Sequence, residues 1–424
     1  MVTRSPNLVL REQMLARGLT REQVADEVCT ASLKLTGEII SCTDRTVGRW
    51  LSGAVTWPWP RYRRPLEAVF NLPITDLGFI PPPGYVGAMV HDIKPSSSPG
   101  SPVLRRNFVI GFGTVLALPV LPVKGRLGLS DIDAIQAASA RLHALDDRHG
   151  GVELADVAAK YVEHIETAAR SCTYGSSVQK RLHSSIGDLA ASAGWFAFDG
   201  DMQDSARRWW DMALKYALLA GDTNLQARVW SYMARQAAHL GHGGEAVAIA
   251  RVALDSSRHR RDARLSALLH SRVALGHSLT GERVRAGQSL HRADRELDRA
   301  TADTVPWLEF CGPAELAGQA ALVDYNLGAY GTAVARDEEA CAVMPAAFGR
   351  NSYATQVSLA RNHLAAGDAD AALVAGHRAV DLMGGGVKSP RWGRHLSQFA
   401  HDVQQGSPPG AVEFADRYRE VVTA

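Results

Sequence analysis

The sequence predicts an all-α protein in which a small helical domain precedes an array of helical repeats. From Ser130 almost to the end, alanine-rich helical periodicity replaces the alternating pattern that strands require. Glycine-containing turns divide this region at residues 220–222, 240–244, 280–282 and 365–368. We therefore expect helices joined by short turns and no strand-rich section.

Composition excludes two broad classes of protein. The chain has 424 residues, and 46 lysines and arginines against 44 aspartates and glutamates leave a formal charge of +2 at pH 7. With 46% hydrophobic and 21% charged residues it is not a disordered chain. The charge balance also excludes a uniformly basic protein that coats nucleic acid, although it leaves room for a local basic surface.

Cysteine usage and the N-terminus indicate a cytoplasmic protein. An odd, sparse set of cysteines without a C-x-x-C pair argues against a disulfide framework or a zinc site and is typical of a reducing compartment. The set is Cys29, Cys42, Cys172, Cys311 and Cys341. The N-terminus contains no apolar core of signal-peptide length, so we expect cytoplasmic localisation.

Shifts in composition divide the chain into five segments. Proline, serine and glycine cluster at residues 80–102, as in a linker. The segments are residues 1–80, an N-terminal helical domain; 81–129, a linker with an apolar segment at 108–123; 130–182, a helical lead-in; 183–384, about five repeats; and 385–424, C-terminal capping helices.

The apolar segment 108–123 has several interpretations. It follows Arg105 and Arg106, and "RRNFVIG" looks like a twin-arginine export motif, but it is internal and follows about a hundred residues that already look folded. With Pro119 and Pro122 it also falls short of the ~20 apolar residues that a spanning helix needs. These facts favour a packed or docking linker over a membrane-surface anchor, and a spanning helix least. We expect no membrane partner.

Small residues recur at a fixed spacing along residues 183–384. Alanines seven positions apart follow a glycine or alanine by twelve positions, with steps of 40, 40, 47 and 39 between units. The sets are Gly194/Ala206/Ala213, Ala234/Ala246/Ala253, Ala274/Ala286/Ala293, Ala321/Ala333/Ala340 and Ala360/Ala372/Ala379. Antiparallel helices cross closely only where side chains are this small, so the spacing predicts five helix pairs.

This pattern resembles the tetratricopeptide repeat, whose small residues fall at positions 8, 20 and 27. Trp230 also matches the large residue at position 4, and Trp210 and Leu290 fit the apolar position 24. The units are longer than the ~34 residues of the family, and they lack its closing proline. The resemblance implies a superhelix of stacked helix pairs.

Residues 7–72 contain the sharpest functional signal. One helix stops at Gly18, a second is capped by Thr20, and a later one is capped by Thr43 and ends at Gly53. The segment is similar to the lambda-repressor-like (XRE-type) helix-turn-helix family, on Leu19-Thr20 with Val24-Ala25 and Arg49-Trp50 with Gly53. Arg21 replaces the usual glutamine, and fourteen residues separate Val28 from Thr43 where the family uses about four. Residues 29–42 therefore extend the second helix or form a small insertion.

Positive charge concentrates where a recognition helix needs it. Residues 43–64 hold five arginines against one aspartate, which suits a surface that contacts phosphates. The resemblance implies that Arg45, Thr46 and Arg49 enter the major groove behind the cap Thr43, because arginine can fork onto guanine. We expect Arg21, Arg61, Tyr62, Arg63 and Arg64 to contact phosphates and fix the register. The alternative is a small helical domain with solvated arginines.

The repeats offer a polar stripe along the first helix of each pair. The stripe is expected to face the concave side of the superhelix. Its effector-groove candidates are Asp188, Trp195, Arg228, Arg235, His239, Tyr325, Asn326 and Arg361. Such a groove could grip a peptide backbone or a carboxylate, and an ordinary solvated groove remains the equal alternative.

No motif indicates catalysis. The chain lacks G-x-S-x-G, H-E-x-x-H and a dinucleotide fingerprint, so we expect no enzymatic activity, no metal and no cofactor. The whole architecture resembles regulators common in actinomycetes and, in outline, the peptide-sensing RRNPP regulators. It implies a homodimeric, sequence-specific transcriptional regulator that binds a near-palindromic operator in double-stranded DNA, with a peptide or small-molecule effector. The alternative is a tetratricopeptide interaction adaptor without sequence-specific DNA binding.

Overall fold

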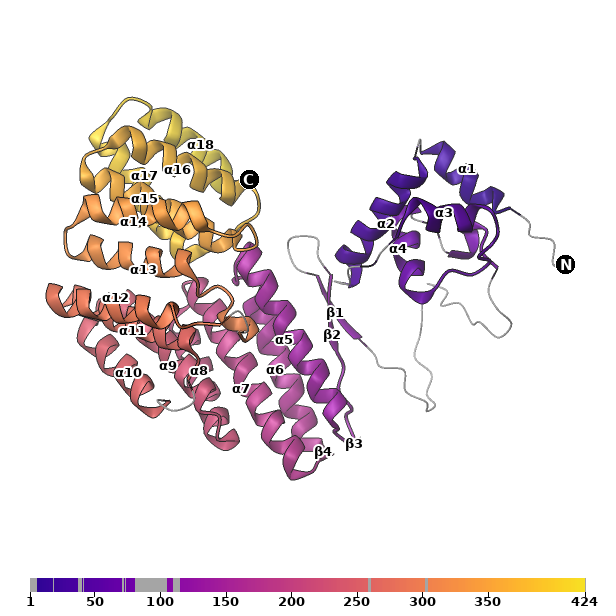
Figure 1. Cartoon of the computed structure of the whole chain (residues 1–424), viewed down its shortest axis with the longest axis horizontal. Coiled ribbons are helices and arrows are strands. Elements are labelled where there is room, and N and C mark those ends of the chain that lie inside the picture. Colours follow the sequence, from indigo (N-terminus) through magenta and orange to yellow (C-terminus); the bar gives the residue numbers. More distant parts are fainter. Residues whose placement is uncertain are drawn as a thin grey trace. The chain divides into compact units, whose positions relative to one another are not determined.

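A computed structural model describes most of the chain as two compact units, which are treated separately below. The described residues are 6–17, 19–36, 40, 42–70, 72, 74–80, 105–109, 115–257, 261–301 and 304–423. The described part contains 18 α-helices and only short strands (Figure 1), which confirms the all-α class. No helix within these ranges is long and apolar enough to cross a membrane.

The N-terminal unit is a small helical domain with its own core. Its elements are α1 (Leu8–Ala16), α2 (Arg21–Thr36), α3 (Asp44–Leu51), α4 (Pro60–Phe70) and the 3₁₀ turn η1 (Ile74–Leu77). Val24, Val28 and Val47 are fully buried, and Trp50 meets Tyr62 edge-on with ring centroids 5.4 Å apart. This apolar contact fixes α3 against α2 and α4.

The predicted start of α3 is confirmed. Thr43 is in an extended conformation, and its Oγ1 accepts a hydrogen bond from the Thr46 amide at 3.3 Å. The Thr46 hydroxyl in turn accepts from the Thr43 amide at 3.4 Å, which completes a capping box. Of the two alternatives for residues 29–42, α2 extends to Thr36, and residues 37–39 and 41 lie outside the described residues.

The repeat unit consists of stacked helix pairs (Figure 1). One layer of helices precedes the pairs and another follows them. The pairs are α7 (Ser176–Asp199) with α8 (Gln203–Ala220), α9 (Thr223–His239) with α10 (Gly243–Ser256), α11 (Ala263–Leu279) with α12 (Arg283–Leu297), α13 (Pro313–Asn326) with α14 (Tyr330–Val343), and α15 (Gly349–Ala366) with α16 (Ala369–Gly384). The 3₁₀ turn η2 (Pro306–Leu308) precedes α13 and accounts for the longer 47-residue step.

The crossing points lie where the sequence predicts them. Every alanine of the five sets is 0% exposed. At Gly194 an added Cβ would stand 2.3 Å from Nε1 of Trp210, so glycine is required there. The turn inside each pair also repeats, with positive φ at Asp201, Gly241, Gly281, Gly328 and Gly367, at the same steps as the alanines. The predicted five helix pairs are confirmed.

The layer that precedes the first pair combines the two helices of the predicted lead-in with an extended segment that belongs to the predicted linker. It contains β1 (Arg105–Val109), β2 (Val115–Pro119), β3 (Gly125–Arg126), α5 (Leu129–His149), α6 (Leu154–Ser171) and β4 (Cys172–Thr173). β1 pairs with β2, and β3 pairs with β4 in parallel.

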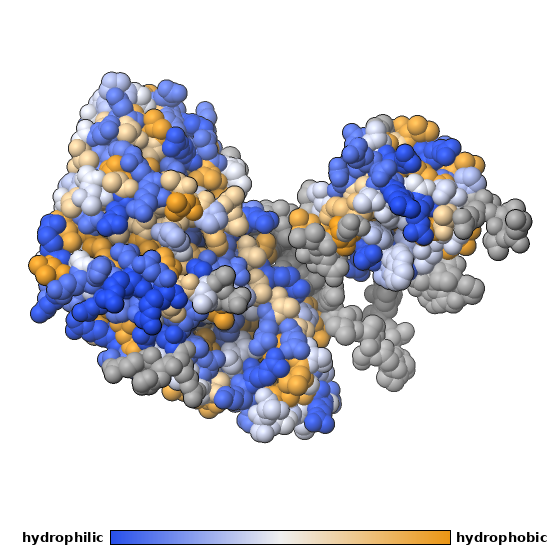
Figure 2. Space-filling model, in the orientation of Figure 1, coloured by the Kyte–Doolittle hydropathy of each residue, from blue (hydrophilic) through white to orange (hydrophobic). Residues whose placement is uncertain are grey.

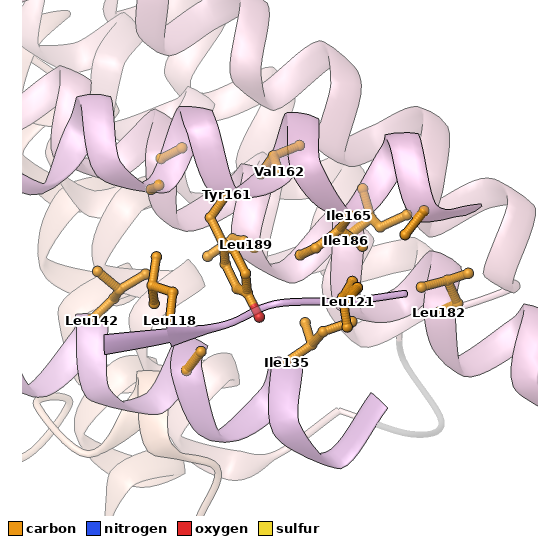
Figure 3. Close-up of a cluster of buried hydrophobic side chains, with 14 of the residues drawn as sticks. Leu118, Leu121, Ile135, Leu142, Tyr161, Val162, Ile165, Leu182, Ile186 and Leu189 are labelled. Carbon is orange, nitrogen blue, oxygen red and sulfur yellow. The ribbon is translucent and has the colours of Figure 1, made fainter. Parts of the chain in front are cut away.

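The end of the apolar segment belongs to this layer. Leu118 and Leu121 are buried and point toward Leu142, Ile135 and the side chains of α6 and α7 (Figure 3). The amide of Leu121 donates to Nε2 of His164 at 3.0 Å. The predicted linker 81–129 therefore includes residues of the repeat-unit core, because an apolar run needs a surface to cover it. Residues 110–114 of the segment lie outside the described residues.

The C-terminal helices return the chain to the first pair. α17 (Pro390–Gly406) and α18 (Ala411–Thr423) pack on α15 and α16. At the start of α17, Asp199 of α7 accepts hydrogen bonds from Ser389 Oγ at 2.8 Å and from Arg391 Nη2 at 3.0 Å, 190 or more positions away. Next to it the amide of Lys388 donates to the carbonyl of His149 at 2.7 Å. These contacts close the array on itself, and we refer to them as the closure.

Two helical glycines provide a test of the crossing geometry. We expect Gly194→Ala to destabilise the protein by about 2–3 kcal/mol, because the methyl group displaces Trp210 and strains its hydrogen bond to the Ala191 carbonyl. Gly287→Ala is the matched control, since Gly287 is exposed on α12 with nothing near its Cβ position. It should stabilise by about 0.5–1 kcal/mol. Chemical denaturation measures the free energy of unfolding of both variants. Equal changes in the two would contradict a close helix crossing at Gly194.

The closure gives a second test. Asp199 is 0% exposed, and Asp199→Ala leaves the Arg391 guanidinium buried without its acceptor, which costs about 3–5 kcal/mol. Asp211→Ala, an exposed carboxylate on α8, should change stability by less than about 0.5 kcal/mol. Thermal unfolding and limited proteolysis of residues 385–424 measure the effect. A variant as stable as the control would show that the closure contributes little.

Candidate functional site

Helix α3 presents a basic face to solvent. Arg45 and Arg49 are exposed and lie four positions apart, so they share one side of the helix. The opposite side carries Val47 and Trp50, which are 0% and 2% exposed. The apolar face thus fixes the helix while both guanidinium groups remain available.

Further exposed arginines of the same unit lie on α2 and α4. A Cβ added at Gly48 would lie 3.3 Å from Nη1 of Arg21, so the guanidinium of Arg21 reaches the middle of α3. Arg61 and Arg64 are exposed on α4. None of these arginines forms an ion pair with a carboxylate of a described residue. An anionic partner would therefore not have to displace such a bridge.

Two of the predicted phosphate contacts have other roles. Tyr62 is 5% exposed and packs against Trp50, so its assignment to the contact surface is wrong. Arg63 is half-buried: its Nε donates to the Pro58 carbonyl at 2.8 Å, and its guanidinium lies 4.9 Å from the centre of the Trp57 ring. Arg63 thus holds the turn that precedes α4.

Inside the repeat unit, a cavity of about 800 Å³ opens between α5 and the first helices of the array. Its walls come from α5, α7 and α9, from the first turn of α11 and from η2. We call it the α5 cavity. Two predicted groove residues line it, Asp188 and Arg228, together with His143 and Trp307, which the repeat pattern could not indicate because they lie outside the repeated helices.

Arg228 organises the polar wall of the α5 cavity. It forms an ion pair with Asp188, donates from Nε to the Tyr232 hydroxyl at 3.0 Å and lies 4.8 Å from the centre of the Trp307 ring. Its Nη2 donates to Ser192 Oγ at 3.0 Å and faces Nε2 of His143 at 3.3 Å. The guanidinium is thus held rigidly, with both its charge and its donors used.

The same network determines the protonation of its members. Burial, reinforced by the charge of Arg228, lowers the pKa of His143 to about 4. Burial raises the pKa of Asp188, but Arg228, His143 and the hydrogen bond from Ser139 together outweigh it and hold that pKa below its ordinary value. Near neutral pH the wall therefore presents a neutral imidazole and a carboxylate neutralised by arginine, which suits a ligand without strong charge.

A second cavity of about 50 Å³ lies between helices α9, α11, α13, α15 and α17, and we call it the arginine cavity. Four arginines from four different helices converge on it: Arg235 of α9, Arg272 of α11, Arg350 of α15 and Arg391 of α17. They are 8%, 1%, 8% and 2% exposed. Of these only Arg235 was predicted, and it lies beside the predicted Trp195.

The other three arginines carry a weaker sequence signal. Arg272 lies one position beyond the predicted stripe, and Arg350 precedes the repeated part of its unit. Arg391 follows the last repeat. Only the closure brings them together.

The remaining groove candidates line neither cavity. The His239 ring meets Phe198 and His395 edge-on, at 5.4 and 6.2 Å between centroids. Asn326 Nδ2 donates to Ser278 Oγ at 3.0 Å. The Arg361 guanidinium lies 4.9 Å from the centre of the Tyr325 ring. These contacts hold neighbouring helices together.

The predicted open groove is therefore wrong in one respect. Arg228 and Arg235 are almost fully buried, because α5, η2 and α17 cover the concave side of the pairs. On the face shown in Figure 2 hydrophilic side chains predominate, and hydrophobic ones form separate small patches. The two cavities are therefore the candidate ligand sites of this unit that follow from the described residues.

The paired histidines predict a sensitivity to acid. Burial, together with nearby arginines, lowers the pKa of both His239 and His395 to about 3. The unfolded chain takes up protons below about pH 6.5 that the folded chain refuses, so stability falls as the pH drops from about 6.5 toward 3. At pH 5 each of the two histidines lowers the free energy of unfolding by about 2 kcal/mol.

Between pH 7 and pH 5, we expect the free energy of unfolding of His395→Gln to fall by about 2 kcal/mol less than that of the wild type. His291→Gln removes an exposed histidine and should follow the wild-type profile. Denaturation at a series of pH values measures the difference, and coincident profiles for all three proteins would refute the assignment.

Comparisons with known proteins give likenesses of fold. No family model and no curated protein matches the sequence. The chain is similar to the crystal structure of BtubC (BKLC) from P. vanneervenii, at 16% identity over 54% of this chain and 89% of that one, with a TM-score of 0.38. It is similar to a Rap protein complexed with competence and sporulation factor, at 14% identity over 70% and 87%, with a TM-score of 0.46. A third likeness is to the APC/C hetero-tetramer Cut9-Hcn1, at 12% identity over 68% and 59%, with a TM-score of 0.33.

Proposed function

We propose that the protein is a sequence-specific DNA-binding transcriptional regulator that acts as a homodimer. The observation that carries this proposal is the exposed pair Arg45 and Arg49 on the capped, amphipathic helix α3. A helix fits the major groove of DNA, and arginine forks onto the O6 and N7 atoms of guanine. The second helix of a helix-turn-helix is placed in this way.

The arginines of α2 and α4 support the same proposal. Arg21, Arg61 and Arg64 are exposed and can contact phosphates on either side of a groove, which fixes the register without reading sequence. Release of counterions from those phosphates supplies much of the affinity. Two such domains in a homodimer would read half-sites about 34 Å apart, or a multiple of that distance.

The repeat unit supplies the second half of the proposed function, the binding of a peptide or small-molecule effector. The α5 cavity has a volume in the range of about 300–1,000 Å³ that is typical of ligand sites. Its polar wall around Arg228 is rigid, while Trp307 and Leu265 provide apolar surface. Because the cavity is already formed, little binding free energy is lost to ordering the protein when a ligand binds.

In-vitro selection of random double-stranded DNA by the full-length protein tests the proposal. We expect a near-palindromic motif to be enriched. At fixed salt, Arg45→Ala or Arg49→Ala should weaken binding to that motif by about 5- to 150-fold, the range of 1–3 kcal/mol for a bidentate contact.

Arg295→Ala, an exposed arginine on α12, is the matched control and should bind as the wild type does. Enrichment of no motif would favour the interaction adaptor instead. An asymmetric, single-site motif would contradict the homodimer.

A further inference from the structure

The arginine cavity contains more positive charge than its neighbours neutralise. Nε and Nη1 of Arg272, Nε and Nη1 of Arg391, and Nε of Arg350 are buried and have no hydrogen-bond acceptor among the described residues. Buried polar atoms in native proteins are nearly always paired, so five unpaired donors around one cavity are unusual. The acceptors Gln319 Oε1, Asp337 Oδ1 and Asn351 Oδ1 of the same lining are unpaired too. Each of the five donors would gain from an acceptor placed between the helices.

The carboxylates that face the cluster compensate it only in part. Glu315 lies 4.0 Å from Nη2 of Arg272, and Asp199 bonds Arg391 and lies 4.0 Å from Nε of Arg350. Asp146 lies 3.9 Å from Nη2 of Arg350, but burial raises its pKa to about 8, so this carboxyl is largely uncharged near neutral pH. Burial raises the pKa of Asp337 to about 7, so that carboxyl is only partly ionised. Among the described residues only three carboxyl groups, those of Glu315, Asp199 and Asp146, thus lie within 4.0 Å of the four guanidinium groups, and Asp146 is largely protonated.

Arg235 is the least compensated of the four. No hydrogen bond or ion pair joins it to another described residue, although it is 8% exposed. Burial, then the charges of Arg391 and Arg272, lower its pKa well below the usual value. Burial is the larger cause, and the neighbouring guanidinium groups of Arg391 and Arg272 add a positive potential at Arg235.

The size of the cavity limits what can fill it. A volume of about 50 Å³ holds a few water molecules or one small group, since a single water needs about 10–15 Å³ on this measure. It does not hold a whole peptide. Planar guanidinium groups match the geometry of phosphate and carboxylate oxygens, which they bind in a bidentate manner.

We propose that the arginine cavity binds one oxyanion group, a phosphate or a carboxylate, of a small ligand. The inference rests on the effector-binding half of the proposed function and specifies the chemistry of the ligand. Arg235, Arg272, Arg350 and Arg391 form the site, and Trp195 and Trp392 border it.

The site is connected to both the closure and the larger cavity. Arg350 and Arg391 also hold Asp199, so an anion between them neutralises the cluster on which the closure depends. The Tyr232 ring contacts Trp195 at the arginine cavity and Trp307 at the α5 cavity, with centroid distances of 5.0 and 6.2 Å. A bound anion therefore stabilises the closed array and affects the wall of the α5 cavity.

Thermal unfolding of the full-length protein tests this site with two simple probes. Sodium phosphate and sodium acetate are titrated separately, each against sodium chloride at the same ionic strength and pH 7. We expect phosphate, acetate or both to raise the Tm by about 3 °C at saturating millimolar concentration, as binding to the native state requires. A rise with phosphate alone identifies a phosphate ligand, and a rise with acetate alone identifies a carboxylate.

Two variants separate a specific site from a general salt effect. Arg235→Met should abolish the rise while its Tm in chloride stays at or above that of the wild type, because a poorly compensated buried charge has been removed. Glu315→Gln removes the carboxylate that competes for Arg272 and should tighten anion binding about fivefold or more. Arg295→Gln, on the surface of α12, should behave as the wild type.

The proposal is overturned if neither anion raises the Tm above that in chloride, or if the rise survives in Arg235→Met and is unchanged in Glu315→Gln. Its failure is distinguishable from failure of the DNA-binding proposal, because selection on random DNA reads out α3 and does not require an anion. If the protein enriches a DNA motif but neither anion raises its Tm, only the DNA-binding half of the proposed function is supported.

Discussion

The closure around Asp199 is the contact on which the interior of the repeat unit depends. A stack of helix pairs left open would keep its concave side in water, and its arginines would be solvated. Here Asp199 of the first pair bonds Ser389 and Arg391 at the start of α17, and that contact holds α17 in place beside the arginine cavity. The predicted groove is reduced to two cavities. Polar side chains such as Arg228 and Arg235, which water would solvate in an open groove, are buried there, and their burial costs free energy.

Most of the repeat architecture could be predicted because it depends on local sterics. A glycine or alanine is needed wherever two helices cross closely, so the spacing of Gly194, Ala206 and Ala213 and its four copies locates the pairs. The backbone of the turns follows the same steps, from Asp201 to Gly367. Thr43 could be assigned as a cap for a similar reason, since capping needs only a hydroxyl three residues before a free amide.

The enclosed interior could not be predicted, because it depends on how far the array curls. That curvature is the sum of many small rotations between pairs, and no single residue encodes it. Arg391 lies beyond the last repeat and Arg350 before the repeated part of its unit, so the repeat pattern assigns neither to the interior. Tyr62 is different: it lies four positions before the buried Leu66 on α4, and this spacing already indicated an apolar face.

The buried arginines are difficult to explain by stability alone. Apolar residues of similar volume at such positions usually give an equally stable or more stable protein, so a cluster with five unpaired donors reduces the stability of the ligand-free fold. An anion therefore binds more favourably to the closed array than to an open one, because water already solvates the same guanidinium groups in the open array. A ligand with such a differential affinity shifts the equilibrium toward closure. The chemistry of the cavity and the geometry of the closure thus form one coupled system, which is the property that a sensing domain requires.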